Sequence, residues 1–458
     1  MQNDTICAIS TPLGISGIGI VRISGPDTYR IIERIFRPAG KTGLRRLPSH
    51  SVRYGYVVDG KKTLDEVLVT IMRKPRSYTR EDMAEIGCHG GIVPLKEVLS
   101  ACIRNGARQA LPGEFTKRAF VNGRIDLAQA ESILEVIYSK TDRSLDMAVN
   151  KLKGNFSKEL AVIRDSLLEA LSVMEARINF PDEEDVESSG FDTARRIREV
   201  LSFTEKTISR AGKGKLIQQG INAAITGRAN AGKSSLLNSL LKEDRAIVTE
   251  VPGTTRDAIQ ETINIRGIPV NIIDTAGIRN VRGRIERMGV EIALRWMDKA
   301  EVNLIMLDGS KKMNEYDRQL LAHIKGKNYL IIINKNDLPE KIEKEQLEKE
   351  FPRKRIVSIS ARTGAGIERL ENEIYALILE GYGEMKGDEM FLNLRQEGKI
   401  VEIREILLLT EKTILDNAEI EIAAENLKTC IRKIDELTGR DVSADVMDRI
   451  FSQFCIGK

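Results

Sequence analysis

A glycine-rich segment that follows an apolar run constrains this chain more than any other part of its sequence. Residues 227–234 read GRANAGKS, and the preceding residues 221–226 (INAAIT) are typical of a buried strand. A GxxxxGKS segment between a strand and a helix forms a phosphate-binding loop, in which backbone N–H groups converge on phosphate oxygens. Lys233 is then placed to reach the β and γ phosphates, and the Ser234 hydroxyl to complete a Mg²⁺ shell. The sequence therefore predicts an α/β domain that binds a nucleoside triphosphate.

Three further segments at predicted strand ends identify the base. Residues 270–277 (VNIIDTAG) end in DxxG, where Asp274 can hold Mg²⁺ through water and the Gly277 N–H can meet the γ phosphate. Residues 329–337 (YLIIINKND) end in NKxD, and residues 358–362 (SISAR) follow where such domains pack the base. The aspartate of NKxD can accept two hydrogen bonds from guanine, a pair that adenine cannot donate. The four segments in this order predict that the domain binds GTP.

The position after DxxG departs from the pattern of small GTPases. In Ras-like domains a glutamine there orients the attacking water, but this chain has Ile278. An aliphatic side chain cannot orient water, so the domain is either nearly inactive or uses another group. Glu286 lies shortly after, among several arginines, and can supply a carboxylate for this purpose. From the residues alone, a solvated acid in a charged loop remains the alternative interpretation of Glu286.

The predicted first switch precedes the DxxG strand, at residues 249–257 (TEVPGTTRD). Thr255 is placed to give its hydroxyl to Mg²⁺ when a γ phosphate is present. Backbone carbonyls of this segment and the amide of Asn230 can enclose a monovalent cation beside the phosphates. Such an ion would stabilise transition-state charge where no arginine finger is supplied.

The predicted secondary structure changes along the chain, which predicts a multidomain protein of the α/β plus all-α class. Residues 1–118 mix strands and helices, residues 119–215 and 381–458 are helical, and residues 216–380 alternate strands with helices. Two helical blocks around an α/β unit favour a P-loop domain inserted into one discontinuous helical domain. Two separate helical domains remain the alternative.

Within the helical blocks the sequence also predicts where individual helices end. An apolar stripe from Phe156 to Ile178 predicts one long helix that ends before Pro181. A second helix is expected to end at Ile208, before a glycine–lysine connection at 211–215. Gly439 predicts a helix stop in the second block.

Composition excludes several classes of protein. The 458 residues carry 71 Lys and Arg against 67 Asp and Glu, a net charge of +4 that argues against coating nucleic acid by bulk charge. The 5 cysteines are scattered without a CxxC pair, so neither a disulfide framework nor a cysteine-built zinc site is expected. The sequence shows no signal-peptide pattern and no long apolar span. We therefore expect a soluble, cytoplasmic protein.

Four stretches outside the P-loop domain carry a family resemblance. Residues 111–131 (LPGEFTKRAFVNGRIDLAQAE), 454–458 (FCIGK), 17–25 (GIGIVRISG) and 88–91 (CHGG) resemble the MnmE/TrmE family of tRNA-modification GTPases. Together with the nucleotide motifs, the likeness covers essentially the whole chain. It implies an N-terminal α/β folate-binding and dimerisation domain, followed by a discontinuous helical domain with an inserted Ras-like P-loop GTPase domain.

The resemblance also implies a reaction. The protein would act with an FAD-dependent partner of the MnmG/GidA kind, as a heterotetramer, on the wobble uridine of certain tRNAs. The pair would add a carboxymethylaminomethyl-type group to carbon 5, with a one-carbon unit from a tetrahydrofolate derivative (5-formyl or 5,10-methylene). The GTPase would be activated by K⁺-dependent dimerisation of its GTPase domains, and the chain would form a homodimer through its N-terminal domain.

Family roles transfer to matching positions of this sequence. The catalytic acid is Glu286, and Mg²⁺ is held by Ser234 and Thr255. The K⁺ positions are Asn230, Thr249, Val251 and Thr254; the folate positions are Arg22, Glu85, Arg124 and Lys458; and Cys455 has a possible chemical role. The whole GTP site is expected to comprise Asn230, Ala231, Gly232, Lys233, Ser234, Ser235, Thr249, Glu250, Val251, Pro252, Gly253, Thr254, Thr255, Asp274, Thr275, Ala276, Gly277, Asn334, Lys335, Asp337, Ser360, Ala361 and Arg362.

A different class of function remains open. A GTP-dependent assembly switch, or a ribosome-associated GTPase without folate chemistry, would carry the same P-loop domain. The first 120 residues and the FCIGK end resemble the modification family and favour it. A membrane-remodelling GTPase is disfavoured because no strongly amphipathic basic helix is evident.

Overall fold

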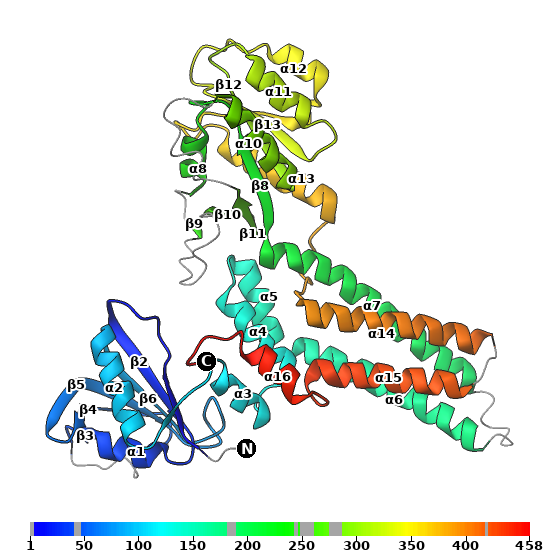
Figure 1. The fold of residues 1–458 in the computed structure, drawn as a ribbon. Helices are drawn as coiled ribbons and strands as arrows, with labels where there is room; N and C mark the ends of the chain where they lie inside the picture. Colours follow the sequence, from blue (N-terminus) through cyan, green and yellow to red (C-terminus); the bar gives the residue numbers. More distant parts are fainter. Residues whose placement is uncertain are drawn as a thin grey trace. The chain divides into compact units, whose positions relative to one another are not determined.

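The computed structural model describes residues 4–40, 47–180, 189–241, 246–247, 261–273, 286–416 and 420–458 (Figure 1). Two compact units divide the chain: the first comprises Met1–Leu134, Lys151–Gly190 and Asp416–Lys458, and the second comprises Glu135–Asn150 and Phe191–Leu415. Each unit therefore draws helices from both predicted helical blocks, which agrees with one discontinuous helical domain. The predicted boundaries at residues 118, 215 and 380 do not coincide with the borders of the units and stay predictions.

The first unit is built on a seven-stranded sheet in the order β3-β4-β5-β6-β2-β1-β7. All neighbours are antiparallel except β1 and β7. The strands are β1 (Ile6–Ile9), β2 (Ser16–Ser24), β3 (Phe36–Pro38), β4 (Ser51–Asp59), β5 (Lys62–Met72), β6 (Met83–Gly90) and β7 (Arg108–Gln109).

Helices α1 (Thr28–Ile35) and α2 (Ile92–Arg104) cover one face of this sheet. Alternation along β5 shows the two faces, because Val67 and Val69 are buried with the helices whereas Leu68 is 51% exposed. Tyr54 and Tyr56 on β4 are exposed in the same way. The sheet therefore leaves an apolar strip on its uncovered face.

The helices of the first unit come from two distant parts of the chain. They are α3 (Glu114–Val121), α4 (Leu127–Ile137, whose last residues belong to the second unit), α6 (Asn155–Asn179), α15 (Ile420–Thr438) and α16 (Ala444–Phe451). Helices α6 and α15 lie side by side (Figure 1), and Arg164 of α6 donates to the Asp435 carboxylate of α15 at 2.7 and 3.0 Å. The predicted long helix and its end before Pro181 are confirmed. Gly439, with φ of 83°, directly follows α15 and confirms the predicted stop.

The second unit contains another seven-stranded sheet, in the order β14-β13-β12-β8-β11-β10-β9. From β14 to β11 the strands are parallel, and β10 and β9 are antiparallel additions at the edge. The strands are β8 (Ile221–Thr226), β9 (Ala246–Ile247), β10 (Glu261–Ile265), β11 (Ile268–Ile272), β12 (Val302–Asp308), β13 (Tyr329–Asn334) and β14 (Ile356–Ser358).

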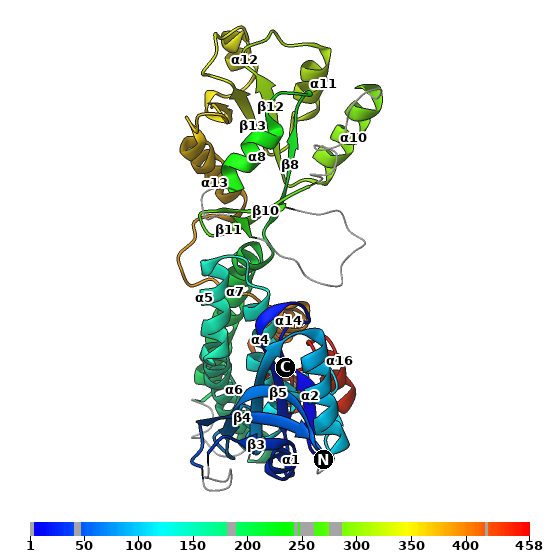
Figure 2. The same cartoon turned by 90° about the vertical axis from the view of Figure 1, so that its left-hand side faces the viewer.

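Helices cover both faces of this sheet (Figure 2). One apolar core lies between the strands and α8 (Lys233–Leu241) and α13 (Ile367–Tyr382). A second core lies beneath α10 (Glu286–Lys299), α11 (Glu315–His323) and α12 (Lys344–Glu350). This doubly wound arrangement puts the carboxyl ends of the parallel strands at one edge, where ligands bind in such folds. It confirms the predicted class of α/β plus helical domains.

Helices from both blocks accompany this sheet within the second unit. They are α5 (Asp142–Leu152, whose end belongs to the first unit), α7 (Ser189–Gln219) and α14 (Leu394–Leu415). The segment before α5 lies against the β10–β11 hairpin, where Thr141 Oγ1 donates to Gly267 O at 3.0 Å and Lys140 Nζ donates to Asn271 Oδ1 at 3.2 Å. No helix among the described residues is both long and apolar enough to cross a membrane.

The predicted break in α7 is wrong. The helix does not end at Ile208 but runs through the glycine–lysine segment at 211–215 to Gln219. Each glycine costs the helix about 1 kcal/mol relative to alanine, yet a Cβ on Gly214 would lie only 1.8 Å from Met390 O. Gly214 is thus explained by the close approach of another backbone segment, a tertiary reason that the local sequence does not show.

Candidate functional site

The phosphate-binding loop joins β8 to α8 in a backbone shape that requires its glycines. Gly227 and Gly232 have φ of 149° and 104°. A Cβ on Gly227 would lie 2.3 Å from Met306 O, and one on Gly232 would lie 2.2 Å from Asn334 Nδ2. Asn230 adopts the left-handed region at φ of 62°, which asparagine tolerates better than most residues. The loop can therefore present its N–H groups inward, as phosphate binding requires.

Lys233 begins α8 and lies along this loop. Its ammonium donates to Gly227 O at 2.6 Å and to Arg228 O at 2.9 Å, so it is held at the start of the loop. Burial lowers the pKa of Lys233 from its usual value, and a phosphate beside it would favour the charged form. Ser234 and Ser235, the next two residues, are exposed at the helix N-terminus.

Asn334, at the end of β13, ties the phosphate loop to the loop after β14. Its side chain is almost fully buried; Nδ2 donates to Ala231 O at 2.7 Å, and Oδ1 accepts from Ala361 N at 2.9 Å. One amide thus holds three predicted GTP-site segments at fixed separations. Each of its polar atoms thus has one partner in a neighbouring loop, so Asn334 positions the loops of the site.

Asp337 presents a carboxylate at the same edge of the sheet. Oδ1 accepts from Ser360 Oγ and Oδ2 accepts from Arg362 Nη2, each at 2.6 Å. The hydrogen bond from Ser360 and the guanidinium of Arg362 hold the pKa of Asp337 below its usual value, against the opposing effect of desolvation. Each oxygen keeps a lone pair for a further donor. The side chain is thus ionised and oriented, as recognition of a pair of N–H donors requires.

Asp308 was not singled out by the sequence motifs, although it ends β12 as the last residue of an apolar run. It is 1% exposed, and it accepts from Lys335 Nζ at 2.7 Å. Burial raises the pKa of Asp308, but the hydrogen bond and charge of Lys335 and the hydrogen bonds from Ser310 outweigh it and leave the pKa lowered. Lys335 has φ of 70°, so this ion pair helps to hold an uncommon backbone turn.

The structure brings the described members of the predicted GTP site onto three loops at the carboxyl edge of the sheet. After β8 these are Asn230, Ala231, Gly232, Lys233, Ser234 and Ser235; after β13 and β14 they are Asn334, Lys335, Asp337, Ser360, Ala361 and Arg362. The predicted residues Thr249, Glu250, Val251, Pro252, Gly253, Thr254, Thr255, Asp274, Thr275, Ala276 and Gly277 lie outside the described residues. Glu286 is the first residue of α10, and its side chain is likewise outside them.

A second cluster of predicted residues lies in the first unit. Arg22 on β2 faces Glu85 on β6, and its Nε and Nη2 donate to Glu85 Oε1 at 2.9 and 2.8 Å. Arg22 Nη1 donates to Gly457 O at 2.9 Å, which brings the end of the chain to this sheet. The pKa of Lys458 is lowered by burial first and then by the charge of Arg22. Three of the four predicted folate residues are thus neighbours.

Tyr78 connects the fourth predicted residue to this cluster. The Arg124 guanidinium lies over the Tyr78 ring, 4.7 Å from its centroid, and the Arg22 guanidinium lies 5.4 Å from the same centroid. The ring of Phe115 lies 5.7 Å from Arg22. The sequence motifs did not identify Tyr78, because the residue belongs to a loop far from both arginines in the chain. The cluster offers cations suited to carboxylates and one acidic group suited to N–H donors.

Cys455 differs in exposure from the other cysteines of the chain. It is exposed, whereas Cys7, Cys88, Cys102 and Cys430 are buried. Burial raises the pKa of Cys7 and of Cys430 to about 12 each, so these thiols stay protonated and unreactive. The Cys455 carbonyl accepts from Gly113 N at 3.4 Å, which fixes its backbone next to α3. Its chemical role stays a prediction.

Comparisons with known proteins cover the whole chain. The family model described as "MnmE helical domain" matches residues 127–455, and the one described as "GTP-binding protein TrmE N-terminus" matches residues 5–124. A "tRNA modification GTPase MnmE" from Alkaliphilus oremlandii is 40% identical over 459 residues, which is 100% of this chain and 99% of the relative. The protein of the same name from Carboxydothermus hydrogenoformans is 40% identical over 464 residues, 100% of both chains.

Among solved structures, the G domain of the T. maritima FeoB iron transporter aligns at 22% identity with a TM-score of 0.27. That overlap covers 34% of this chain and 98% of the transporter domain. The family assignment rests on the sequence relatives, which match the whole chain.

Proposed function

The chain belongs to the MnmE family of tRNA modification GTPases, and from that premise we propose that it modifies the wobble uridine of certain tRNAs together with an FAD-dependent partner of the MnmG/GidA kind. It is a GTP-hydrolysing enzyme that acts in tRNA modification. The modification is the addition of a carboxymethylaminomethyl-type group to carbon 5, with a one-carbon unit from a tetrahydrofolate derivative. The two proteins act as a heterotetramer in the cytoplasm.

One observation carries this proposal beyond GTP binding alone. The chain contains, besides the loops around Asp337, a separate cluster of Arg22, Arg124 and Lys458 beside Glu85. A pure nucleotide switch has no use for such a cluster. A reduced folate fits it chemically, because its glutamate carboxylates match the three cations.

The residues of the three loops bind GTP and its metal ion. The backbone N–H groups of residues 227–232 and the Lys233 ammonium bind the phosphates, and Asp337 selects guanine. Ser234 is exposed at the N-terminus of α8, where its hydroxyl would hold Mg²⁺. Thr255 and, through water, Asp274 would complete the coordination of the ion. When bound, Mg²⁺ and K⁺ neutralise the charge that develops on the phosphates. Glu286 orients the attacking water.

The monovalent cation site is proposed for Asn230, Thr249, Val251 and Thr254, and K⁺ bound there promotes dimerisation of the GTPase domains. Of these residues the structure describes Asn230. It is exposed and lies in the phosphate-binding loop, which supports its assignment to the K⁺ site. A homodimer forms through the N-terminal domain. The exposed apolar strip of Tyr54, Tyr56 and Leu68 on its sheet supports that part of the proposal.

GTP hydrolysis is expected to be at least about tenfold faster in K⁺ than in Na⁺ at matched ionic strength, because a fitted cation supplies the charge of the missing arginine finger. Phosphate release measured in the two buffers checks this. Asn230→Gly keeps the left-handed backbone accessible and removes the amide, so it is expected to lose most of the difference between the ions. Equal rates of the unaltered protein in both buffers would contradict the K⁺ site.

A further inference from the structure

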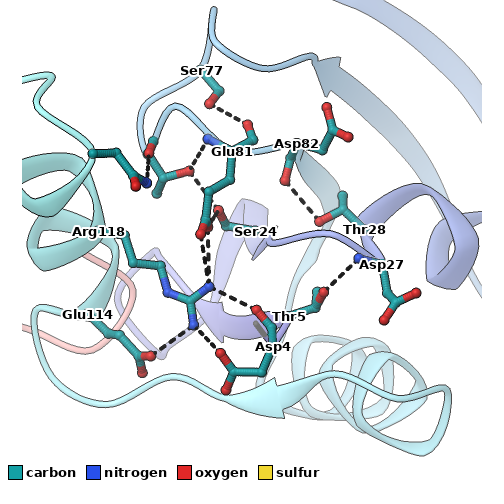
Figure 3. Close-up of polar contacts among 12 residues, drawn as sticks. Asp4, Thr5, Ser24, Asp27, Thr28, Ser77, Glu81, Asp82, Glu114 and Arg118 are labelled. Carbon is teal, nitrogen blue, oxygen red and sulfur yellow. Dashed lines mark hydrogen bonds and ion pairs between the residues drawn. The ribbon is translucent and has the colours of Figure 1, made fainter. Parts of the chain in front are cut away.

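The loop between β5 and β6 is braced by buried hydroxyl groups. Ser24 Oγ lies 2.7 Å from both Thr79 Oγ1 and Glu81 Oε2, and Ser24 and Thr79 are fully buried. Ser77 Oγ donates to Glu81 O at 2.5 Å (Figure 3). Asn122 Nδ2 donates to Thr79 O at 2.7 Å. These bonds fix the path of the loop on both sides of Tyr78.

Arg118 of α3 ties the same loop to the rest of the unit. Its guanidinium reaches Glu81 at 3.2 Å, Asp4 Oδ1 at 2.7 Å and Glu114 Oε1 at 3.1 Å (Figure 3). Only 13% of the Arg118 side chain is exposed. Burial alone would lower the pKa of Arg118, but the carboxylates raise it overall, so the group stays charged. Helix α3 and the loop are therefore held at a fixed separation.

Tyr78 spans the gap between the two fixed elements. Its hydroxyl lies 2.8 Å from Oγ1 of Thr116, a fully buried residue of α3. The ring is thereby oriented from both ends, by its own loop and by the helix. Its face is then available to the guanidiniums of Arg22 and Arg124, because the negative face of an aromatic ring attracts cations.

The two arginines depend on this ring to different degrees. Arg22 is also held by Glu85 and by Gly457 O. Among the described residues, the Tyr78 ring is the only side-chain partner of Arg124. Two like charges near one another repel and would otherwise spread apart. The ring offsets that repulsion for both cations at once.

We propose that Tyr78 is the positioning residue of this anion site: it holds the guanidiniums of Arg22 and Arg124 together so that both meet the carboxylates of one ligand. The inference rests on the proposed folate function and names the part of the ligand concerned, the glutamate tail rather than the pterin. Glu85, whose Oε1 accepts from Arg22 Nε and Nη2, orients Arg22 at this site. Without the ring, Arg124 would lose its orientation first.

The test is calorimetry on the full-length protein with tetrahydrofolate, and competition with 6-methyltetrahydropterin, which has no carboxylate. Tyr78→Leu is expected to weaken tetrahydrofolate about tenfold and to leave the affinity for the pterin unchanged. Tyr78→Phe keeps the ring, loses only the bond to Thr116, and is expected to stay within about threefold of the unaltered protein. Arg124→Ala combined with Tyr78→Leu should be little worse than Arg124→Ala alone, because Tyr78 acts mainly on the Arg124 guanidinium, while Glu85 and Gly457 O still hold Arg22.

The outcomes separate this inference from the function beneath it. If the unaltered protein does not bind tetrahydrofolate, the folate function falls, and the role of Tyr78 with it. If it binds and Tyr78→Leu binds equally well, the positioning role alone is overturned. A loss of affinity for the pterin equal to that for tetrahydrofolate would also overturn it, because a general disturbance of the domain has that effect. An unchanged affinity of each variant for the pterin shows that the unit around Tyr78 is folded.

Discussion

Replacing Glu286 by alanine is expected to reduce the rate of GTP hydrolysis by about 100-fold or more while GTP still binds. The reason is the residue after DxxG, Ile278, which cannot orient water. Glu286 is the first residue of α10, shortly after the DxxG segment in the chain. A carboxylate that orients or deprotonates the attacking water acts on the transition state and contributes little to nucleotide affinity.

Two measurements check this expectation in K⁺ buffer: single-turnover phosphate release and the affinity for a fluorescent GTP analogue. Glu291→Ala is the matched control, because Glu291 is an exposed acid on the same helix. That variant is expected to hydrolyse GTP at the rate of the unaltered protein. Undiminished turnover by Glu286→Ala would remove Glu286 from the chemistry. A loss of GTP affinity parallel to the loss of rate would assign it to binding instead.

Replacing Asp337 by asparagine is expected to weaken GTP binding at least about 100-fold. Two hydrogen bonds to a charged acceptor, worth about 1.5–3 kcal/mol each, are replaced by an amide that turns a donor toward the donors of guanine. The same amide suits xanthine, which has a carbonyl where guanine has its amine. Xanthosine triphosphate is therefore expected to bind the variant better than GTP does.

Competition between the two nucleotides measures this reversal. Arg362→Ala is a useful comparison, because Arg362 contacts Asp337 at 2.6 Å but is 76% exposed. Removing an exposed ion pair is expected to change GTP affinity less than about fivefold. If Asp337→Asn retained its preference for GTP over xanthosine triphosphate, the guanine role of Asp337 would be wrong.

The elements that carry motifs could be predicted from the sequence because their chemistry is local. The phosphate loop requires a strand, two glycines and a helix in immediate succession, and the structure places β8, Gly227, Gly232 and α8 in that order. NKxD likewise puts Asp337 directly after a strand. In each case residue type and backbone shape are linked within a few positions.

The features that were missed depend on contacts between distant parts of the chain. Gly214 was interpreted as part of a helix break, because the local sequence does not show that the backbone of Met390 packs against it. Tyr78 lies near Arg22 and Arg124 only after β2, α3 and the loop before β6 are assembled. Asp308 ends a strand as many aspartates do, and its ion pair with Lys335 appears only when β12 and β13 are paired. Such partners follow from the fold and not from spacing.

The central claim, that this GTPase serves wobble uridine modification, is tested most directly by nucleoside analysis of tRNA from cells that lack the protein. The wobble uridine is predicted to lose its carboxymethylaminomethyl-type group. The unaltered gene is predicted to restore it, whereas Glu286→Ala is not. A fully modified wobble uridine in cells without the protein would contradict the account and favour a GTP-dependent assembly switch instead.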